Sequence, residues 1–170
     1  QLLNKISSNS KEMIENMSDI VWMIKPGNDD FTSIENRMLN FANELCTPAG
    51  INFEFSKDEA VNTIQISMEH RRDIYLIFKE AVNNAAKYSE CKNLWISFIS
   101  EPNILKLTIK DDGNGFAASP PTSLQNRREL GGNGIINMKN RAQEIKGELF
   151  INSQEAKGTE VILKLHTKKS

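Results

Sequence analysis

Three polar side chains that could serve phosphate chemistry share one face of a predicted helix. Glu80, Asn84 and Lys87 lie at positions i, i+4 and i+7 of the segment 69–89, so a helix places them in one stripe. A carboxylate can act as a base, an amide oxygen can bind a hard cation, and an ammonium group can contact phosphate. A solvated face with a charge pair explains the same spacing. However, two consecutive asparagines at 83 and 84 are a poor choice for such a helix interior.

Two glycine-rich segments further along the chain could bring the backbone close to a ligand. Residues 111–116 read D-D-G-N-G-F and follow a predicted strand, so a carboxylate stands at the strand end beside a tight turn. Residues 131–134 read G-G-N-G and precede a helix predicted over 135–145, whose free N–H groups suit phosphate. The second segment is neither a Walker loop nor a dinucleotide fingerprint. Taken singly, each segment is also explained as an ordinary turn.

The order and spacing of these segments resemble the ATP-binding domain of two-component sensor histidine kinases. The matching stretches are E-A-V-N-N-A-A-K-Y-S from residue 80, D-D-G-N-G-F from 111, G-G-N-G-I-I-N-M-K-N-R-A from 131 and G-T-E-V from 158. The wider group includes DNA gyrase, a heat-shock chaperone family and the MutL mismatch-repair proteins, and the chain is similar to its branch of nitrate/nitrite-type sensors. The resemblance covers about residues 30–166. It implies ATP and Mg²⁺ as cofactors and a Bergerat-type ATP fold.

The resemblance assigns one set of residues to the phosphates of ATP. It implies that Asn84 coordinates the Mg²⁺ ion, that Glu80 positions or activates chemistry near the γ-phosphate, and that Lys87 contacts a phosphate. Gly132 and Gly134 match the glycines that let a lid fold over the triphosphate. Positioning and charge neutralisation are what phosphoryl transfer mainly requires.

The resemblance assigns a second set of residues to the adenine base. Asp111 matches the carboxylate that accepts a hydrogen bond from the adenine amino group, and Tyr88 would pack beside the ring. Gly113 and Gly115 would open space for the base, and Thr159 would place a small hydroxyl near the adenine pocket.

The segment 116–131 corresponds to the ATP lid of the family. Arg127 and Arg128 are candidates for phosphate contact within it, although two exposed loop arginines are also explained as plain surface. Departures from the family pattern are modest, since Asn133 replaces a commonly seen histidine and Ile135 replaces a leucine.

The acceptor histidine of such a kinase is expected outside this sequence. The two histidines, His70 and His166, do not stand where the family places the acceptor, so we interpret both as structural or surface residues. Residues 1–25 carry an apolar heptad seam that ends at Pro26-Gly27, which resembles the second helix of a dimerisation hairpin. Because the chain begins at Gln1, we expect the helix with the acceptor to lie upstream.

Hydrophobic periodicity predicts the elements that position these residues. A helix follows Thr32, with Thr32 and Glu35 at capping-box spacing, and ends at Pro48-Ala49-Gly50. Alternating runs predict strands at 51–55 and 64–68, a hairpin of 94–100 with 104–110, and a hairpin of 148–152 with 160–165. The pattern indicates an α+β fold, a two-layer sandwich in which about three helices cover one face of a mixed, mainly antiparallel sheet. One long N-terminal helix precedes it, so we divide the chain into 1–27 and a catalytic domain at 28–170.

Composition excludes several classes of protein. The 170 residues carry a net charge of −1, which gives no electrostatic basis for direct nucleic-acid binding. No apolar run is long enough to span a membrane, so contact with a membrane is expected only through upstream segments. Cys46 and Cys91 lack metal-ligand spacing and are predicted to be free thiols. Free thiols fit a reducing compartment, and the resemblance to sensor kinases implies that the chain is the cytoplasmic end of a membrane-anchored sensor.

The sequence thus predicts the catalytic part of a protein-histidine kinase. It would form a homodimer through its N-terminal helix and pass the phosphoryl group to the aspartate of a response-regulator receiver domain. Without the acceptor histidine, this chain is not expected to phosphorylate itself. Two alternatives remain open: a serine kinase of the anti-sigma type on the same fold, and a degenerate module that senses nucleotide without transferring phosphate.

Overall fold

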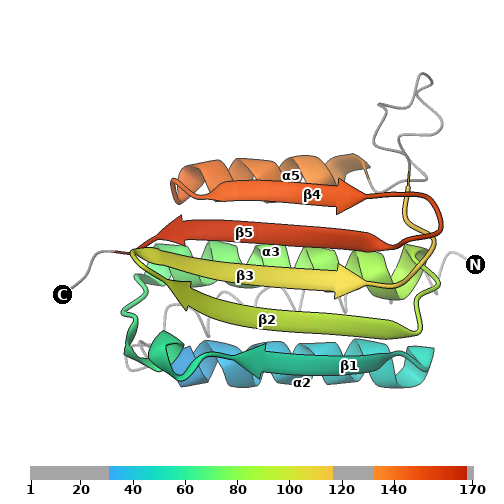
Figure 1. Cartoon of the computed structure of the whole chain (residues 1–170), viewed down its shortest axis with the longest axis horizontal. Helices are drawn as coiled ribbons and strands as arrows, with labels where there is room; N and C mark the ends of the chain where they lie inside the picture. Colours follow the sequence, from blue (N-terminus) through green and yellow to red (C-terminus); the bar gives the residue numbers. More distant parts are fainter. Residues whose placement is uncertain (1–30, 117–131, 168–170) are drawn as a thin grey trace, which may run out of the picture.

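Three helices pack on one face of a five-stranded sheet in the structure, a computed structural model that describes residues 31–116 and 132–167 (Figure 1). The helices are α2 (Phe31–Ala49), α3 (Met68–Tyr88) and α5 (Gly132–Glu144), with a short 3₁₀ helix, η1 (Glu59–Thr63), between the first two. The strands are β1 (Asn52–Lys57), β2 (Asn93–Glu101), β3 (Ile104–Asp111), β4 (Glu148–Ser153) and β5 (Thr159–His166). This arrangement confirms the predicted α+β sandwich.

The sheet is mixed, as predicted, with strand order β1-β2-β3-β5-β4. β1 runs parallel to β2, and the other three pairs are antiparallel. The parallel pair follows from the connection, because η1 and α3 lie between β1 and β2 and return the chain to the same end of the sheet. Both predicted hairpins, β2–β3 and β4–β5, are confirmed, and their alternating side chains set the register.

The core lies between α3 and the inner face of the sheet. Alternate residues of β2, Leu94, Ile96 and Phe98, turn toward the helices and are almost fully buried. Phe98 packs edge-on against Phe31 of α2, with 4.8 Å between the ring centroids. Ser67 precedes α3, and its side chain accepts a hydrogen bond from the His70 backbone N–H at 3.3 Å, which fixes where the helix begins.

Two predictions about the first half of the chain are wrong. Residues 64–68 do not form a strand, because the chain passes from η1 through an extended segment directly into α3. Their apolar alternation instead reflects Ile66, which is buried, and Ile64, which packs against the core without a strand partner. Thr32 does not cap its helix either, since α2 already includes Phe31, and Glu35 pairs with Lys57 across to β1.

The third helix begins earlier than predicted and is held against α3 by buried charge. α5 starts at Gly132 and not at residue 135, so the glycines form its first turn. Asp73 of α3 is fully buried and accepts hydrogen bonds from Arg72 and, at 3.2 Å, from Arg141 Nη1 of α5. The Asp73–Arg141 pair therefore joins the two helices whose opposite ends carry the predicted ATP residues.

The remaining predictions concern the cysteines, the N-terminal helix and the lid. Cys46 and Cys91 are free and buried, as predicted, and burial raises the pKa of the Cys46 thiol to about 11. The predicted helix at 1–27 and most of the predicted lid, with Arg127 and Arg128, lie outside the described residues. Among the helices that are described, none is long and apolar enough to cross a membrane.

Candidate functional site

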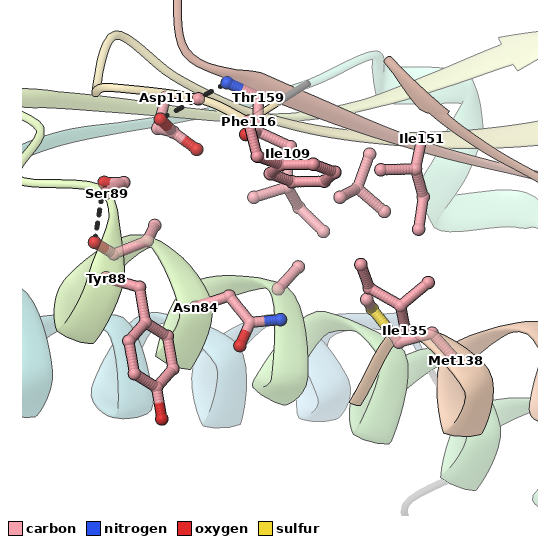
Figure 2. A pocket seen from close by; sticks show the side chains of 14 residues that line it. Asn84, Tyr88, Ser89, Ile109, Asp111, Phe116, Ile135, Met138, Ile151 and Thr159 are labelled. Carbon is pink, nitrogen blue, oxygen red and sulfur yellow. Dashed lines mark hydrogen bonds between the residues drawn. The ribbon is translucent and has the colours of Figure 1, made fainter. Parts of the chain in front are cut away.

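A cavity of about 190 Å³ opens between the helix layer and the sheet. It lies at the right of Figure 1, where α3 and β3 end and where β5 and α5 begin. Figure 2 shows it from close by, with Asn84 and Tyr88 of α3 on one wall and Asp111 and Thr159 on the other. Most of its lining is apolar: Ala81, Ala85, Ile109, Phe116, Ile135, Met138, Ile151 and Val161. Such a cavity suits a flat, apolar ring that carries few polar groups.

The last two turns of α3 form the helical wall of the cavity. Ala81, Asn84, Ala85 and Tyr88 line it because residues three and four apart share a helix face. Asn84 is half-buried and is the polar group of this wall nearest the middle of the helix. Tyr88 lines the rim, and 59% of it is exposed; its ring extends away from Asp111 (Figure 2). Lys87 is exposed and does not line the cavity.

Asp111 closes the sheet side of the cavity with a buried carboxyl group. Its Oδ1 accepts hydrogen bonds from the backbone N–H groups of Gly113, at 2.9 Å, and Thr159, at 3.3 Å. Within the described residues, no donor reaches Oδ2. Burial raises the pKa of this carboxyl group, although the two backbone hydrogen bonds oppose the shift. Oδ2 of this buried residue is therefore a hydrogen-bond acceptor that faces the cavity and is left for a ligand.

The neighbouring carboxylate, Asp112, serves the fold instead. It is exposed, and its oxygens accept hydrogen bonds from the backbone N–H groups of Lys92 and Asn93, both at 2.8 Å, and from Asn93 Nδ2 at 2.7 Å. These hydrogen bonds lower its pKa, with the Asn93 backbone contribution the largest. Asp112 thus anchors the start of β2, and the two adjacent aspartates have separate tasks.

The glycines after Asp111 permit a turn that no larger residue would fit. A Cβ atom on Gly113 would lie 2.2 Å from the Ser89 carbonyl oxygen, at the end of α3. Gly115 lines the cavity with a φ of +58°, and a Cβ there would lie 2.1 Å from the Gln154 carbonyl oxygen. The turn therefore passes tightly between α3 and the β4–β5 hairpin and leaves the cavity open.

Glu80 and the start of α5 meet one turn away from the cavity. A Cβ atom on Gly134 would lie 1.8 Å from Glu80 Oε1, so a larger residue there would force the Glu80 carboxylate out of its position. Glu80 is half-buried and does not line the cavity itself. Gly132 is the first residue of α5, and Ile135 in the first turn of that helix lines the cavity, so the N-terminal end of α5 lies beside the site.

The sequence reasoning missed a hydroxyl network on the sheet side. Thr159 lines the cavity, and its Oγ1 lies 2.9 Å from Ser153 Oγ of β4. The same Ser153 oxygen accepts a hydrogen bond from the Phe116 N–H at 2.9 Å. Ser89, the C-cap of α3, was missed as well. The placement of Ser153 opposite Thr159 in the predicted β4–β5 hairpin is the signal that could have found it.

The polar groups around the cavity are too few to hold a metal ion by themselves. No cluster of three or more acidic, histidine or cysteine side chains exists within 31–116 and 132–167. A Mg²⁺ ion commonly takes one or two protein ligands together with the phosphates of a bound substrate. The half-buried amide of Asn84 fits that requirement.

A family of known ATPases matches more than half of the chain. The family model for histidine kinase-, DNA gyrase B-, and HSP90-like ATPases matches residues 69–169. The chain is 35% identical over 88 residues to the sensor histidine kinase YdfH of Bacillus subtilis, covering 51% of this chain and 20% of YdfH. It is 31% identical over 87 residues to the nitrate/nitrite sensor protein NarX of Escherichia coli, covering 51% and 13%. The chain thus matches a fifth or less of these relatives' lengths.

Solved structures of histidine kinases share the fold. The Acinetobacter baumannii histidine kinase AdeS superposes with a TM-score of 0.68 at 20% identity, covering 99% of this chain and 86% of that one. The catalytic domain of the histidine kinase ThkA superposes with a TM-score of 0.63 at 14% identity, covering 83% and 96%.

Proposed function

Since the chain belongs to the family of histidine kinase-, DNA gyrase B-, and HSP90-like ATPases, we propose that it is the ATP-binding catalytic part of a sensor histidine kinase. The observation that carries the proposal is Oδ2 of the buried residue Asp111, an acceptor at the end of an apolar cavity that no donor among the described residues uses. The relatives named above are sensor kinases, which favours histidine over serine as the phosphoryl acceptor.

The cavity is the proposed site of the adenine ring. Its apolar walls bury the flat faces of the base, and Asp111 Oδ2 accepts a hydrogen bond from the exocyclic amino group. A carboxylate acceptor discriminates strongly between bases with an amino group and bases with an oxygen at position six. With an oxygen there, both that oxygen and Asp111 Oδ2 would be acceptors, and neither would receive a hydrogen bond from the other. Tyr88 stands at the rim, and in this proposal its exposed ring turns toward the cavity to pack beside the base. Gly113 and Gly115 keep the turn clear of the base.

The phosphates are proposed to lie along α3 toward the start of α5. Asn84 is the protein ligand for Mg²⁺, and the metal, when bound, neutralises charge on the phosphates. Lys87 lies one turn further along the same stripe and contacts phosphate from its exposed position. The free N–H groups at Gly132 add the positive end of a helix dipole. Glu80 orients the reacting group, and the lack of a side chain on Gly134 leaves room for its carboxylate.

The proposed reaction transfers the γ-phosphoryl group to a histidine imidazole of the complete protein. The bond to the bridging oxygen breaks, a bond to the imidazole nitrogen forms, and ADP leaves. In this proposal the segment 1–27 forms the second helix of a dimerisation hairpin, and a response-regulator aspartate then receives the phosphoryl group in the cytoplasm.

The proposal is tested by supplying the missing acceptor. The 170-residue chain, Mg²⁺ and γ-labelled ATP are incubated with the histidine-bearing hairpin of the full-length protein, and the label on the hairpin is measured. We expect acid-labile, base-stable label, which is characteristic of phosphohistidine. Acid-stable label on serine would favour the serine kinase alternative. Nucleotide binding without any transfer would favour the nucleotide-sensing module.

Two adjacent asparagines provide a matched control for the metal. Asn84→Ala removes the proposed Mg²⁺ ligand, whereas Asn83→Ala removes an equivalent side chain that does not line the cavity. We expect the first variant to lose labelling and the second to retain it. Equal losses in both variants would contradict the role given to Asn84.

A further inference from the structure

Ser153 joins three segments around the cavity without lining it. It is the last residue of β4, and its hydroxyl oxygen accepts a hydrogen bond from the Phe116 N–H at 2.9 Å. The same oxygen lies 2.9 Å from Thr159 Oγ1 and 3.3 Å from the Gly158 carbonyl oxygen. Phe116 and Thr159 both line the cavity, so one hydroxyl group touches two parts of its wall from behind.

Counting protons favours one direction for these hydrogen bonds, although either hydroxyl of the Ser153–Thr159 pair could be the donor. A serine hydroxyl has one proton to donate and two lone pairs. The Phe116 N–H occupies one lone pair. The Gly158 carbonyl oxygen can only accept, so the serine proton goes there, although Gly158 also receives the Gln154 N–H at 3.4 Å. The remaining contact is satisfied only if Thr159 donates its proton to Ser153. In this arrangement all three contacts are hydrogen bonds at once.

In this arrangement the Thr159 hydroxyl proton is bound to Ser153 and is not available to a ligand. Two backbone donors beside Asp111 are already used, because the N–H groups of Gly113 and Thr159 both bind Asp111 Oδ1. The Phe116 N–H is used by Ser153. What this end of the cavity can offer a ligand is therefore acceptors, with Asp111 Oδ2 foremost. A ligand must bring donor hydrogens to this end.

We propose that Ser153 is a positioning residue that sets base selectivity by holding the Thr159 proton away from the nucleotide. The inference rests on the proposed adenine site and deepens it. With Ser153 present, the amino group at position six of a purine can donate hydrogen bonds to acceptors of the cavity wall. An oxygen at the same position receives no hydrogen bond from Thr159. Without Ser153, Thr159 is free to turn its hydroxyl proton toward that oxygen.

A bracing role for Ser153 makes a different prediction. If the Ser153 hydroxyl group only stiffened the hairpin and Phe116, its loss would lower the affinity for every purine nucleotide by the same factor. The ratio of two affinities therefore separates the roles, because stability and wall rigidity cancel in it. ADP and IDP form a suitable pair, since IDP carries an oxygen in place of the amino group at position six and an N1–H donor in place of the N1 acceptor. Both differences are the same in every variant, so a change in the affinity ratio between variants reports on the protein.

The experiment measures the dissociation constants of ADP and IDP by calorimetry for the wild-type chain, S153A, T159V and the double variant. We expect S153A to narrow the preference for ADP about fivefold, the worth of one ordinary hydrogen bond gained by IDP. The double variant should lose that gain, because the freed proton belongs to Thr159. The effect of S153A must therefore depend on Thr159.

Each outcome decides one of the two claims. A wild-type chain that binds neither nucleotide overturns the adenine site itself. A wild-type chain that prefers ADP, with an unchanged ratio in S153A or an equal change with and without Thr159, overturns the role of Ser153 alone. If S153A does not fold, NMR of the wild-type chain replaces it: a slowly exchanging Thr159 hydroxyl proton close to the Ser153 β protons is expected. Rapid exchange of that proton with water would refute the proposal.

Discussion

Replacing Asp111 with asparagine should abolish tight ADP binding while leaving the fold intact. Asp111 Oδ1 accepts from the N–H groups of Gly113 and Thr159, so the asparagine oxygen must take that place. The amide nitrogen, a donor, then occupies the position of Oδ2 and faces the donor hydrogens of the adenine amino group. The substitution thus removes an acceptor and places two donors against each other.

The expected loss follows from the value of a charged hydrogen bond. Hydrogen bonds to charged groups contribute about 1.5–3 kcal/mol, which corresponds to about 10- to 150-fold in the dissociation constant. Because a donor replaces the acceptor, we expect the upper part of that range, about 100-fold. IDP, which carries an oxygen in place of the amino group, should lose far less, and its affinity may be compared directly in the same titration series.

Stability distinguishes this loss from misfolding. Burial raises the pKa of Asp111, so the folded chain holds the proton more tightly than the unfolded chain does. The contribution of this carboxyl group to stability is therefore greatest below its unfolded pKa and declines as pH rises through the raised folded value. At neutral pH the neutral asparagine avoids the cost of a buried charge. We expect the nucleotide-free variant to melt no lower than the wild type.

The neighbouring aspartate is the matched control. Asp112→Asn weakens the hydrogen bonds that Asp112 accepts from Lys92 and Asn93, so it should lower the melting temperature. It should leave ADP affinity within about twofold, a change smaller than one ordinary hydrogen bond. If Asp111→Asn bound ADP as tightly as the wild type, or if both variants lost affinity equally, the assignment of Asp111 to the base would be refuted.

Three further predictions test the site and the core. ADP affinity should fall as pH is lowered toward the raised pKa of Asp111, because protonation removes the charged acceptor, and the residual affinity of Asp111→Asn should lack this dependence in calorimetry. Gly134→Ala should reduce phosphotransfer about tenfold or more, since its Cβ displaces Glu80, whereas the melting temperature should change little because alanine favours the helix. Phe98→Ala should cost about 3–5 kcal/mol in denaturant unfolding, whereas Trp95→Ala on the open face of the same strand should cost much less.

Local patterns in the sequence identified most of the elements. Alternating apolar residues predicted β2, β3, β4 and β5 to within two residues at each end, because side chains of a strand covered on one face must alternate between core and solvent. The spacing of apolar residues likewise predicted α3 within one residue at each end. These features depend on residues that are close in the sequence, so they can be predicted from the sequence alone.

Patterns that depend on a distant partner misled the sequence reasoning. The alternation at 64–68 resembles a strand, but no neighbouring strand pairs with it, and Ile66 reaches the core from an extended segment. Thr32 and Glu35 have capping-box spacing, yet Glu35 is used by Lys57 on β1. A strand needs a partner and a cap needs an unused side chain, and neither requirement is visible locally.

The sequence by itself determined which residue types are available for nucleotide chemistry and the order in which they occur. Only the tertiary structure decided which of them share a cavity. It separated Asp111, whose Oδ2 is left for a ligand, from Asp112, whose oxygens anchor β2. It also placed Ser153 behind Thr159. The physical reason is that burial and hydrogen-bond partners are set by contacts between residues far apart in the chain, and these contacts decide which polar groups remain free to bind.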